Sequence, residues 1–341
     1  MLSLLCISKD LLNFGLMKRA FIVVLLLLAW VPGYCQFFQK IDNWLRQRQS
    51  KQAYDTTCIY RPQERWLVRT KANVGMEGYT LGAAGGEIGF AGYGLIVANR
   101  PRYKHSIGGG YRHLTLDIGF TLLGKQETAD FALTIYGNRL GLMLEGSLAS
   151  GLTGAATAGG NSFTVNPGTV AGIYSQVKAY YAFNGGRFSL PAAVTQAYRQ
   201  RRSAGSLLAL VSAGVMPVIA IDEEIRDKYF EQAVCAYAGA GLGYGYNWVP
   251  SQHWLVHACL TETVGIWNGT SMRIKGIDRD LKRHTPIFVT TGSVALLYYY
   301  RKWYFGAYGA LDSLLFMGED DASMLMGRLK SSANLTAGIR F

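Results

Sequence analysis

A two-residue period in hydrophobicity runs through most of the chain after about residue 65, and it limits the fold more than any other feature. Across 233–248 the even-numbered residues are apolar and end in Trp248, whereas half of the odd-numbered residues are glycine. A β-strand sends alternate side chains to opposite faces, so each such segment has one apolar face. The closing segment, 332–341, repeats the pattern with Leu335 and Phe341 on its apolar face. The pattern predicts an all-β protein.

Two architectures fit long alternating strands: a soluble sandwich with an apolar interior, and a membrane barrel with an apolar exterior. The segments run to ten residues or more, whereas strands of soluble proteins are usually about five or six residues long. Only 16% of the residues are charged, against about 25% in soluble domains. The chain also ends on an alternating strand with an aromatic residue, Phe341. We therefore predict a transmembrane antiparallel up-and-down β-barrel of about 12 strands, within a range of 10–14.

The strand pattern also predicts the orientation of the barrel. We expect strands at about 65–77, 86–98, 106–120, 129–137, 139–150, 172–183, 205–219, 232–248, 253–267, 285–300, 302–315 and 325–341. Short turns follow the second, fourth, eighth and tenth strands, near Pro101, Gly137, Pro250 and Arg301. Long connections lie at 150–171, 220–231, 268–284 and 316–324. Bacterial barrels have short periplasmic turns and long external loops, which places both chain ends in the periplasm.

The first 35 residues have the features of a secretory signal peptide. Lys18 and Arg19 precede a short apolar run, 20–30, and small residues follow it, so we expect cleavage between Cys35 and Gln36. The residues before Met17 then represent an overlong start. Residues 36–62 form a predicted periplasmic segment with a short helix at 37–48, and 63–341 form the barrel. The expected location is the outer membrane of a Gram-negative bacterium.

One connection breaks the alternation of short and long links. Residues 184–204 form a long link on the short-turn side of the predicted barrel, and they are basic. They are either a solvated periplasmic excursion or a basic plug or docking segment at the periplasmic mouth. The candidate residues for a plug or docking role are Arg187, Arg199, Arg201 and Arg202.

The face opposite the apolar one is assigned to the lumen, and it is polar and mostly basic. The lumen-lining candidates are Arg69, Lys71, His113, Asp117, Gln176, Lys178, Tyr180, His257, Asn334 and Arg340. Such a lumen either favours anions in a pore or forms an internal hydrogen-bonded network in a closed barrel. His113 and Asp117 share a strand face but lie roughly 13 Å apart, too far for a direct hydrogen bond. We assign no catalytic residue.

The sequence predicts lipid and assembly partners rather than cofactors. It contains no spacing typical of a metal site, a nucleotide loop or a nucleophile elbow, so we expect no metal and no cofactor. The formal net charge of +12 favours membrane lipids, including anionic lipopolysaccharide, and an exported protein is not expected to bind nucleic acid. The strand ending in Phe341 is expected to engage the barrel-assembly machinery. We predict that Cys235 and Cys259 are free thiols.

Several segments resemble an uncharacterised family of outer-membrane proteins, the domain of unknown function 4421. The matching pieces are DTTCIYRPQERWLVR (55–69), IYGNRLG (135–141), 180–208, GLGYGYNWVP (241–250) and the closing GIRF (338–341). The resemblance implies an outer-membrane barrel and transfers no activity and no site residues. Three hypotheses therefore stay open: a narrow pore, transport or structural envelope protein; an outer-membrane enzyme acting on lipid or peptide; and a surface or periplasmic binding module.

Overall fold

The structure is a computed structural model that describes residues 54–84, 93–112, 114–121, 128–137, 139–158, 161–228, 230–274, 277–281, 287–318 and 323–341. All of them belong to one compact unit, Ala53–Phe341. The predicted signal peptide, the predicted helix at 37–48 and the candidate residue His113 lie outside the described residues.

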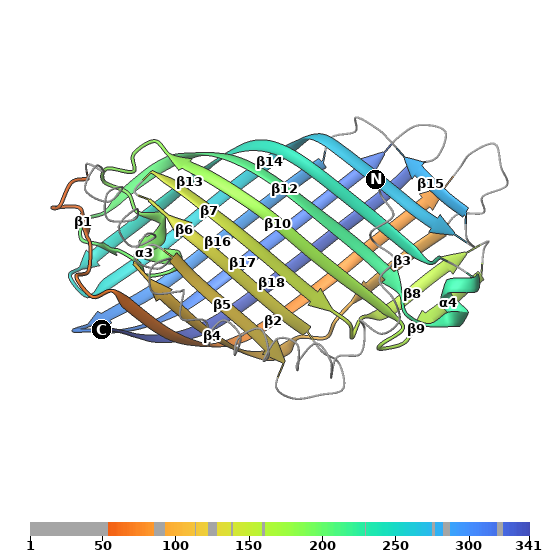
Figure 1. Cartoon of the computed structure of the whole chain (residues 1–341), viewed down its shortest axis with the longest axis horizontal. Helices are drawn as coiled ribbons and strands as arrows, with labels where there is room; N and C mark the ends of the chain where they lie inside the picture. Colours follow the sequence, from red (N-terminus) through yellow and green to blue (C-terminus); the bar gives the residue numbers. More distant parts are fainter. Residues whose placement is uncertain are drawn as a thin grey trace, which may run out of the picture. The chain divides into compact units, whose positions relative to one another are not determined.

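Twelve antiparallel strands form a closed barrel, as predicted from the sequence (Figure 1). Neighbouring strands pair in chain order, and β18 pairs with β2 from Arg340↔Leu67 to Ser323↔Ala84, which closes the wall. The strands are β2 (Trp66–Ala84), β4 (Arg102–Tyr111), β5 (Leu114–Thr121), β6 (Thr128–Tyr136), β7 (Leu140–Ala149), β10 (Val170–Ala182), β12 (Ala204–Ala220), β13 (Gln232–Ser251), β14 (Trp254–Ile274), β16 (Ile287–Tyr300), β17 (Trp303–Gly318) and β18 (Ser323–Arg340).

Two of the predicted strands are wrong, and the two errors cancel in the count. The predicted strand 86–98 is not a separate strand of the wall, because β3 (Tyr93–Ala98) lies in line with β4 along the same edge of β2 and pairs with β8 on its other side. The predicted strand 106–120 is two strands, β4 and β5, joined by a tight turn. Arg112 occupies this turn with φ of 53°. Glycine or asparagine usually occupies such a left-handed position. Because an arginine occupies it here, the sequence does not indicate a turn.

The two ends of the barrel differ. At one end, called here the turn end, β2 begins, β18 finishes, and tight turns such as Arg301–Lys302 join the strands. The other end, called the loop end, carries longer connections with structure of their own: β3, β8 (Thr153–Ala158), β9 (Asn161–Val165), α4 (Glu223–Lys228) and β15 (Ile277–Leu281). None of the helices in the described part of the chain is both long enough and apolar enough to cross a membrane.

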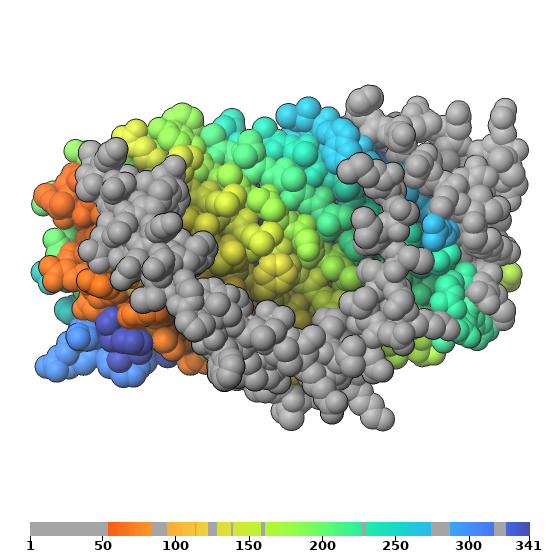
Figure 2. All heavy atoms as spheres, viewed as in Figure 1, coloured from red at the N-terminus to blue at the C-terminus, as the bar shows by residue number. Residues whose placement is uncertain are grey.

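Large apolar side chains cover the outside of the wall. Along β14, Leu260 is 62% exposed while the next residue, Thr261, is 8% exposed. Aromatic side chains gather on the outside near the turn end, among them Trp66, Trp254 and Trp303. The side chains of the strands coloured yellow to green form a continuous surface on the visible face (Figure 2). An apolar outer face with an aromatic girdle is the surface of a membrane-spanning barrel, because lipid and not water contacts it.

Candidate functional site

A cluster of buried charges crosses the middle of the lumen. The Arg328 guanidinium donates to Glu77 at 2.7 Å and to Asp312 at 2.7 Å. It also donates to the Ser147 hydroxyl at 3.3 Å and lies 3.9 Å from the centre of the Tyr174 ring. Ser147 comes from β7 while Glu77 and Arg328 come from β2 and β18, so the contacts connect distant parts of the wall. Charges this deeply buried must be paired, since an isolated one would be very costly.

Two further carboxylates each join a pair of cations. Asp130 accepts from Lys104 at 2.7 Å and from Lys330 at 2.8 Å. Asp117 accepts from Arg69 and lies 3.2 Å from Lys71. Each carboxylate therefore compensates two cations from other strands of the wall.

These pairs correct the expectation of a basic lumen. The carboxylates Glu77, Asp130, Glu145 and Asp312 face the same cavity as the cations, in addition to Asp117. These carboxylates, apart from Asp117, and the cations Lys104, Arg328 and Lys330 are not among the residues predicted from the sequence, although their positions alternate correctly with their lipid-facing neighbours. The two-residue period within each strand was the signal that could have found them.

Below the charge cluster, toward the turn end, lies a cavity of about 270 Å³. The predicted residues Lys71, Asp117, Lys178, Tyr180 and Asn334 line it. Lys178 donates to the Thr291 hydroxyl at 3.0 Å. Gln176 lies nearby in the wall and donates to the Tyr237 hydroxyl at 2.9 Å. The side chains of Leu190 and Val194 line the same cavity, and both come from the connection between β10 and β12.

That connection, residues 183–203, folds into the turn end of the barrel and is called here the plug. It contains α3 (Leu190–Val194) and β11 (Arg199–Gln200), and β11 pairs with β1 (Ile59–Tyr60) from the segment before the barrel. Ser189 caps α3 by accepting from Ala192 N, and Pro191 lies in the first turn, where its missing N–H costs nothing. Phe188, Ala192 and Ala193 are 0% exposed. A surface excursion would leave these side chains in water.

Hydrogen bonds tie the plug to strands on several sides of the wall. Arg69 donates to the Thr195 carbonyl at 2.8 Å and Arg340 donates to the Gln196 carbonyl. The Tyr299 hydroxyl donates to the Ala192 carbonyl at 3.1 Å. These three anchors come from β2, β18 and β16.

The fourth anchor is a pair of side chains from β13 and β14. Asn247 donates from its amide nitrogen to the Ser189 carbonyl at 2.8 Å. The amide oxygen of Asn247 lies 2.7 Å from Nδ1 of His257, which is 1% exposed. His257 therefore positions Asn247 against the plug. These four anchors come from the arc of the wall that runs from β2 through β18 and β16 to β13.

The four arginines of this connection lie away from its buried interior. Arg187 lies 3.5 Å from the Asp55 carboxylate, and Arg202 is exposed. Arg199 donates to the Gln252 carbonyl and lies 5.0 Å from the centre of the Tyr299 ring, and Arg201 lies 4.6 Å from the centre of the Tyr60 ring. The plug interior is accordingly apolar and amide-rich, and the basic side chains form its outer face.

Two groups outside the membrane-spanning strands have altered acidity. The pKa of Asp55 is lowered, chiefly because its carboxylate accepts from the Thr57 hydroxyl at 2.6 Å and from the Thr57 N–H at 2.9 Å. Burial raises the pKa of Tyr198 in the plug to about 12, against the opposing effect of Arg61. Tyr198 is therefore neutral at the pH of the cell envelope.

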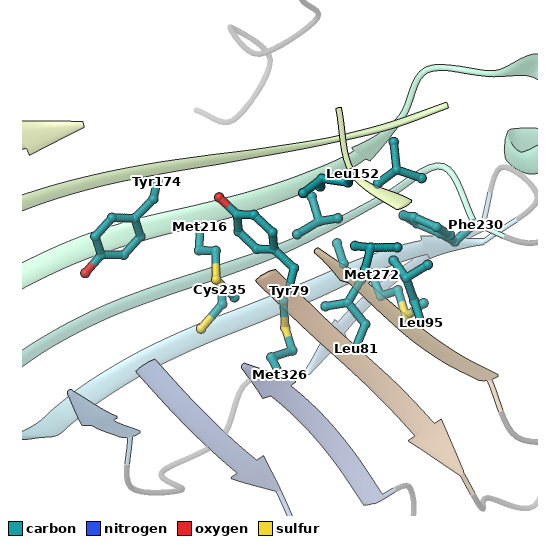
Figure 3. Close-up of a cluster of buried hydrophobic side chains, with 14 of the residues drawn as sticks. Tyr79, Leu81, Leu95, Leu152, Tyr174, Met216, Phe230, Cys235, Met272 and Met326 are labelled. Carbon is teal, nitrogen blue, oxygen red and sulfur yellow. The ribbon is translucent and has the colours of Figure 1, made fainter. Parts of the chain in front are cut away.

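An apolar cluster fills the lumen at the loop end (Figure 3). Leu81, Met216 and Met326 point inward from the wall, and Phe230 adds an aromatic ring from the connection after α4. Tyr79 joins this cluster to the buried charges, because its hydroxyl donates to Glu77 at 2.7 Å. Met216 and Met326 are 0% exposed, so this part of the lumen is packed with side chains.

The thiols and the possible metal ligands are the remaining groups that could carry chemistry. Cys58, Cys235 and Cys259 are free, as predicted for the latter two. In the described part of the chain, no three His, Cys, Asp or Glu side chains come together in a way that could hold a metal ion.

The fold and the lumen define this protein as a membrane β-barrel whose interior is filled from both ends. The chain belongs to the family of the domain of unknown function DUF4421, whose model matches residues 54–341. No curated protein matches the sequence.

Among solved structures, the chain is similar to outer-membrane barrels at low identity. The outer membrane protease OmpT from Escherichia coli is 11% identical, with 82% of this chain and 98% of that chain covered and a TM-score of 0.39. The toluene transporter TodX from Pseudomonas putida is 9% identical, with 82% and 91% covered and a TM-score of 0.31. An outer membrane channel from Pseudomonas putida F1 is 12% identical, with 84% and 100% covered and a TM-score of 0.31. Neither a substrate nor a mechanism transfers from these structures to this chain.

Proposed function

We propose that this protein is a closed outer-membrane β-barrel with a structural role in the envelope of a Gram-negative bacterium, and that it is not an open pore. The predicted signal peptide and the aromatic girdle support the outer membrane as its location. The turn end, which carries both ends of the barrel chain, then faces the periplasm.

The observation that carries the proposal is the double closure of the lumen. The plug fills the turn end through bonds to strands on different sides of the wall, such as those from Arg69 and Asn247. The apolar cluster fills the loop end, and the charge cluster around Arg328 lies between the two. A water-filled channel needs a continuous polar path, and an apolar packed layer interrupts such a path.

The rate at which a reagent labels Cys259 tests the closure, because Cys259 lines the cavity between the two filled ends and is a free thiol. The variant Cys58→Ser/Cys235→Ser of the chain from Gln36 onward leaves Cys259 as the only thiol. In lipid vesicles, a charged thiol reagent added on both sides should modify Cys259 very slowly. The same variant unfolded in urea should react at once and serves as the control.

A gated pore is the second candidate, and the polar cavity of about 270 Å³ favours it. Replacing residues 189–198 by a flexible Gly-Ser linker removes the central part of the plug, including α3, and leaves the strands of the wall unchanged. Rapid labelling of Cys259 in this variant and slow labelling in its parent would locate the access route at the turn end. Rapid labelling of the parent with the plug intact would contradict a closed lumen.

A further inference from the structure

A second cavity, of about 570 Å³, opens at the turn end beside the plug. Three parts of the chain line it: the segment before β2, strand β11 with the residues after it, and the turn between β16 and β17. Tyr299 and Tyr304, which are 4% and 1% exposed, also line it and come from the barrel wall. The cavity is thus a pocket between the plug and the barrel rim.

The pocket has a strong excess of positive charge. Six cations line it against one carboxylate, that of Glu64; the cations are Arg199, Arg201, Arg202, Arg301, Lys302 and Arg340. Within the ranges that the structure describes, none of the six lies within ion-pair distance of a carboxylate. The charge clusters of the lumen, in contrast, pair almost every cation with an acid. Six cations facing a single carboxylate repel one another and destabilise a fold, so an anionic ligand would relieve a cost that the protein otherwise carries.

Three of the guanidinium groups are held in place by contacts that do not neutralise them. Arg199 bonds to the Gln252 carbonyl, and Arg340 bonds to the Gln196 carbonyl. Arg201 lies over the Tyr60 ring and donates to the Thr56 carbonyl at 3.4 Å. Each guanidinium carries five N–H donors, so each keeps donors for a ligand. Ordered arginines that retain free donors are suited to phosphate, whose oxygens accept in the paired geometry of the guanidinium fork.

We propose that this basic pocket binds a phosphate-bearing ligand, clamped between the plug arginines Arg201 and Arg202 and the rim residues Arg301 and Lys302. Because the ligand would contact both the plug and the barrel, binding would also stabilise the plug in its place. The proposal does not depend on whether the barrel conducts ions. Its test measures ligand binding and not the closure of the lumen.

The position of the pocket admits two sources of phosphate. Trp303 lines it and is 46% exposed, and its ring stacks with that of Phe305 at 6.4 Å between ring centres. Aromatic girdles mark the level of lipid headgroups, so a phospholipid headgroup of the inner leaflet can reach the pocket. A soluble phosphate compound of the periplasm can reach it from the open side.

The experiment measures binding to the folded chain from Gln36 onward. In one arm inorganic pyrophosphate is titrated into the protein in a non-ionic detergent, and binding heat is recorded by calorimetry. In the other arm the protein is placed in vesicles of phosphatidylcholine with or without phosphatidic acid, and tryptophan fluorescence is followed.

Arg202→Gln and Lys302→Gln, alone and combined, remove one charge from the plug and one from the rim. Arg139→Gln is the matched control, because Arg139 is an exposed arginine in another turn at the same end and does not line the pocket.

We expect the combined variant to bind roughly tenfold more weakly or worse, since one charge-assisted hydrogen bond is enough for a tenfold change in an equilibrium constant. The Arg139→Gln variant should bind like the wild type. Saturable binding of pyrophosphate would identify a soluble source, and a response to phosphatidic acid alone would identify a lipid source. No binding in either arm, or equal losses in the control and the pocket variants, would overturn the proposal. Heat-modifiable migration on gels verifies that each variant is folded.

Discussion

The guanidinium of Arg328 connects more lumen groups than any of its described neighbours in the charge cluster, and its removal is the sharpest test of that cluster. It contacts Glu77, Asp312 and Ser147 and is 3% exposed. We expect Arg328→Met to lower the free energy of unfolding by about 3–5 kcal/mol, because it leaves a buried carboxylate without its partner. Urea unfolding in lipid vesicles, followed by tryptophan fluorescence, measures the change.

The double variant Glu77→Gln/Arg328→Met is the control for this prediction. Removing both charges together should cost less than the sum of the single changes, since Glu77 is then not left as an unpaired charge and only Asp312 loses its arginine. Arg226→Met on α4 removes an arginine from a surface pair with Glu223 at 3.3 Å and should change stability by less than about 1 kcal/mol. A similarly small effect of Arg328→Met would show that the charge cluster does not hold the lumen together.

Tyr198 gives a prediction about pH in the plug. Burial raises its pKa from 10.0 to about 12, so the folded plug favours the neutral phenol. The resulting stability is fully present below pH 10 and is lost as the pH rises toward 12, because the unfolded plug ionises first. Tyrosinate absorbance of the wild type minus that of Tyr198→Phe should show one tyrosine titrating near pH 12. A difference curve centred near pH 10 would place Tyr198 in water.

At the scale of elements, glycines on the inner face of β13 allow close contact with β14. A side chain at Gly241 would meet the backbone carbonyl of Glu262, which cannot rotate away. We expect Gly241→Ala to destabilise the barrel by about 1–3 kcal/mol, the usual cost of overpacking. Gly292→Ala is the control, because the nearest atom to its new methyl group is Leu260 Cδ1 at 3.8 Å. Equal unfolding midpoints for the two variants would contradict this packing.

The barrel could be predicted from the sequence because its strands are long and each carries the two-residue period. The β4–β5 turn could not, because Arg112 adopts a left-handed conformation that its residue type does not indicate. The structure of the plug was also beyond prediction. Its fixed position depends on contacts such as Arg69 with Thr195, which lie 126 residues apart in the chain. A local pattern contains no information on pairs at that separation.

The candidate site could be predicted only in part, for a related reason. Arg69, Lys71 and Lys178 are predicted on the inner face because apolar and polar residues alternate regularly along their strands. Glu77 and Asp312 lie near the ends of predicted strands, where the two-residue period alone does not separate an inward-facing residue from one in a connection. The sequence therefore predicts fewer carboxylates in the lumen than the structure contains, and the interior carries both acidic and basic side chains instead of mainly basic ones.

At the scale of the whole molecule, the barrel is filled by two separate closures. The plug belongs to one connection, whereas the apolar cluster is built from inward-facing side chains of many strands and of the loop-end connections. We therefore expect the loss of one closure to leave the other in place. In a variant that lacks the plug, the turn end should be open while the apolar cluster still closes the loop end.

Ion conductance across a planar bilayer tests this claim most directly. The chain from Gln36 onward is compared with the variant whose residues 189–198 are replaced by a Gly-Ser linker. We predict no steady openings from either protein, because the apolar cluster with Leu81, Met216 and Met326 still fills the loop end. Steady, ion-selective openings of the wild-type barrel would contradict the closed lumen, and openings of the plug-less variant alone would contradict the second closure.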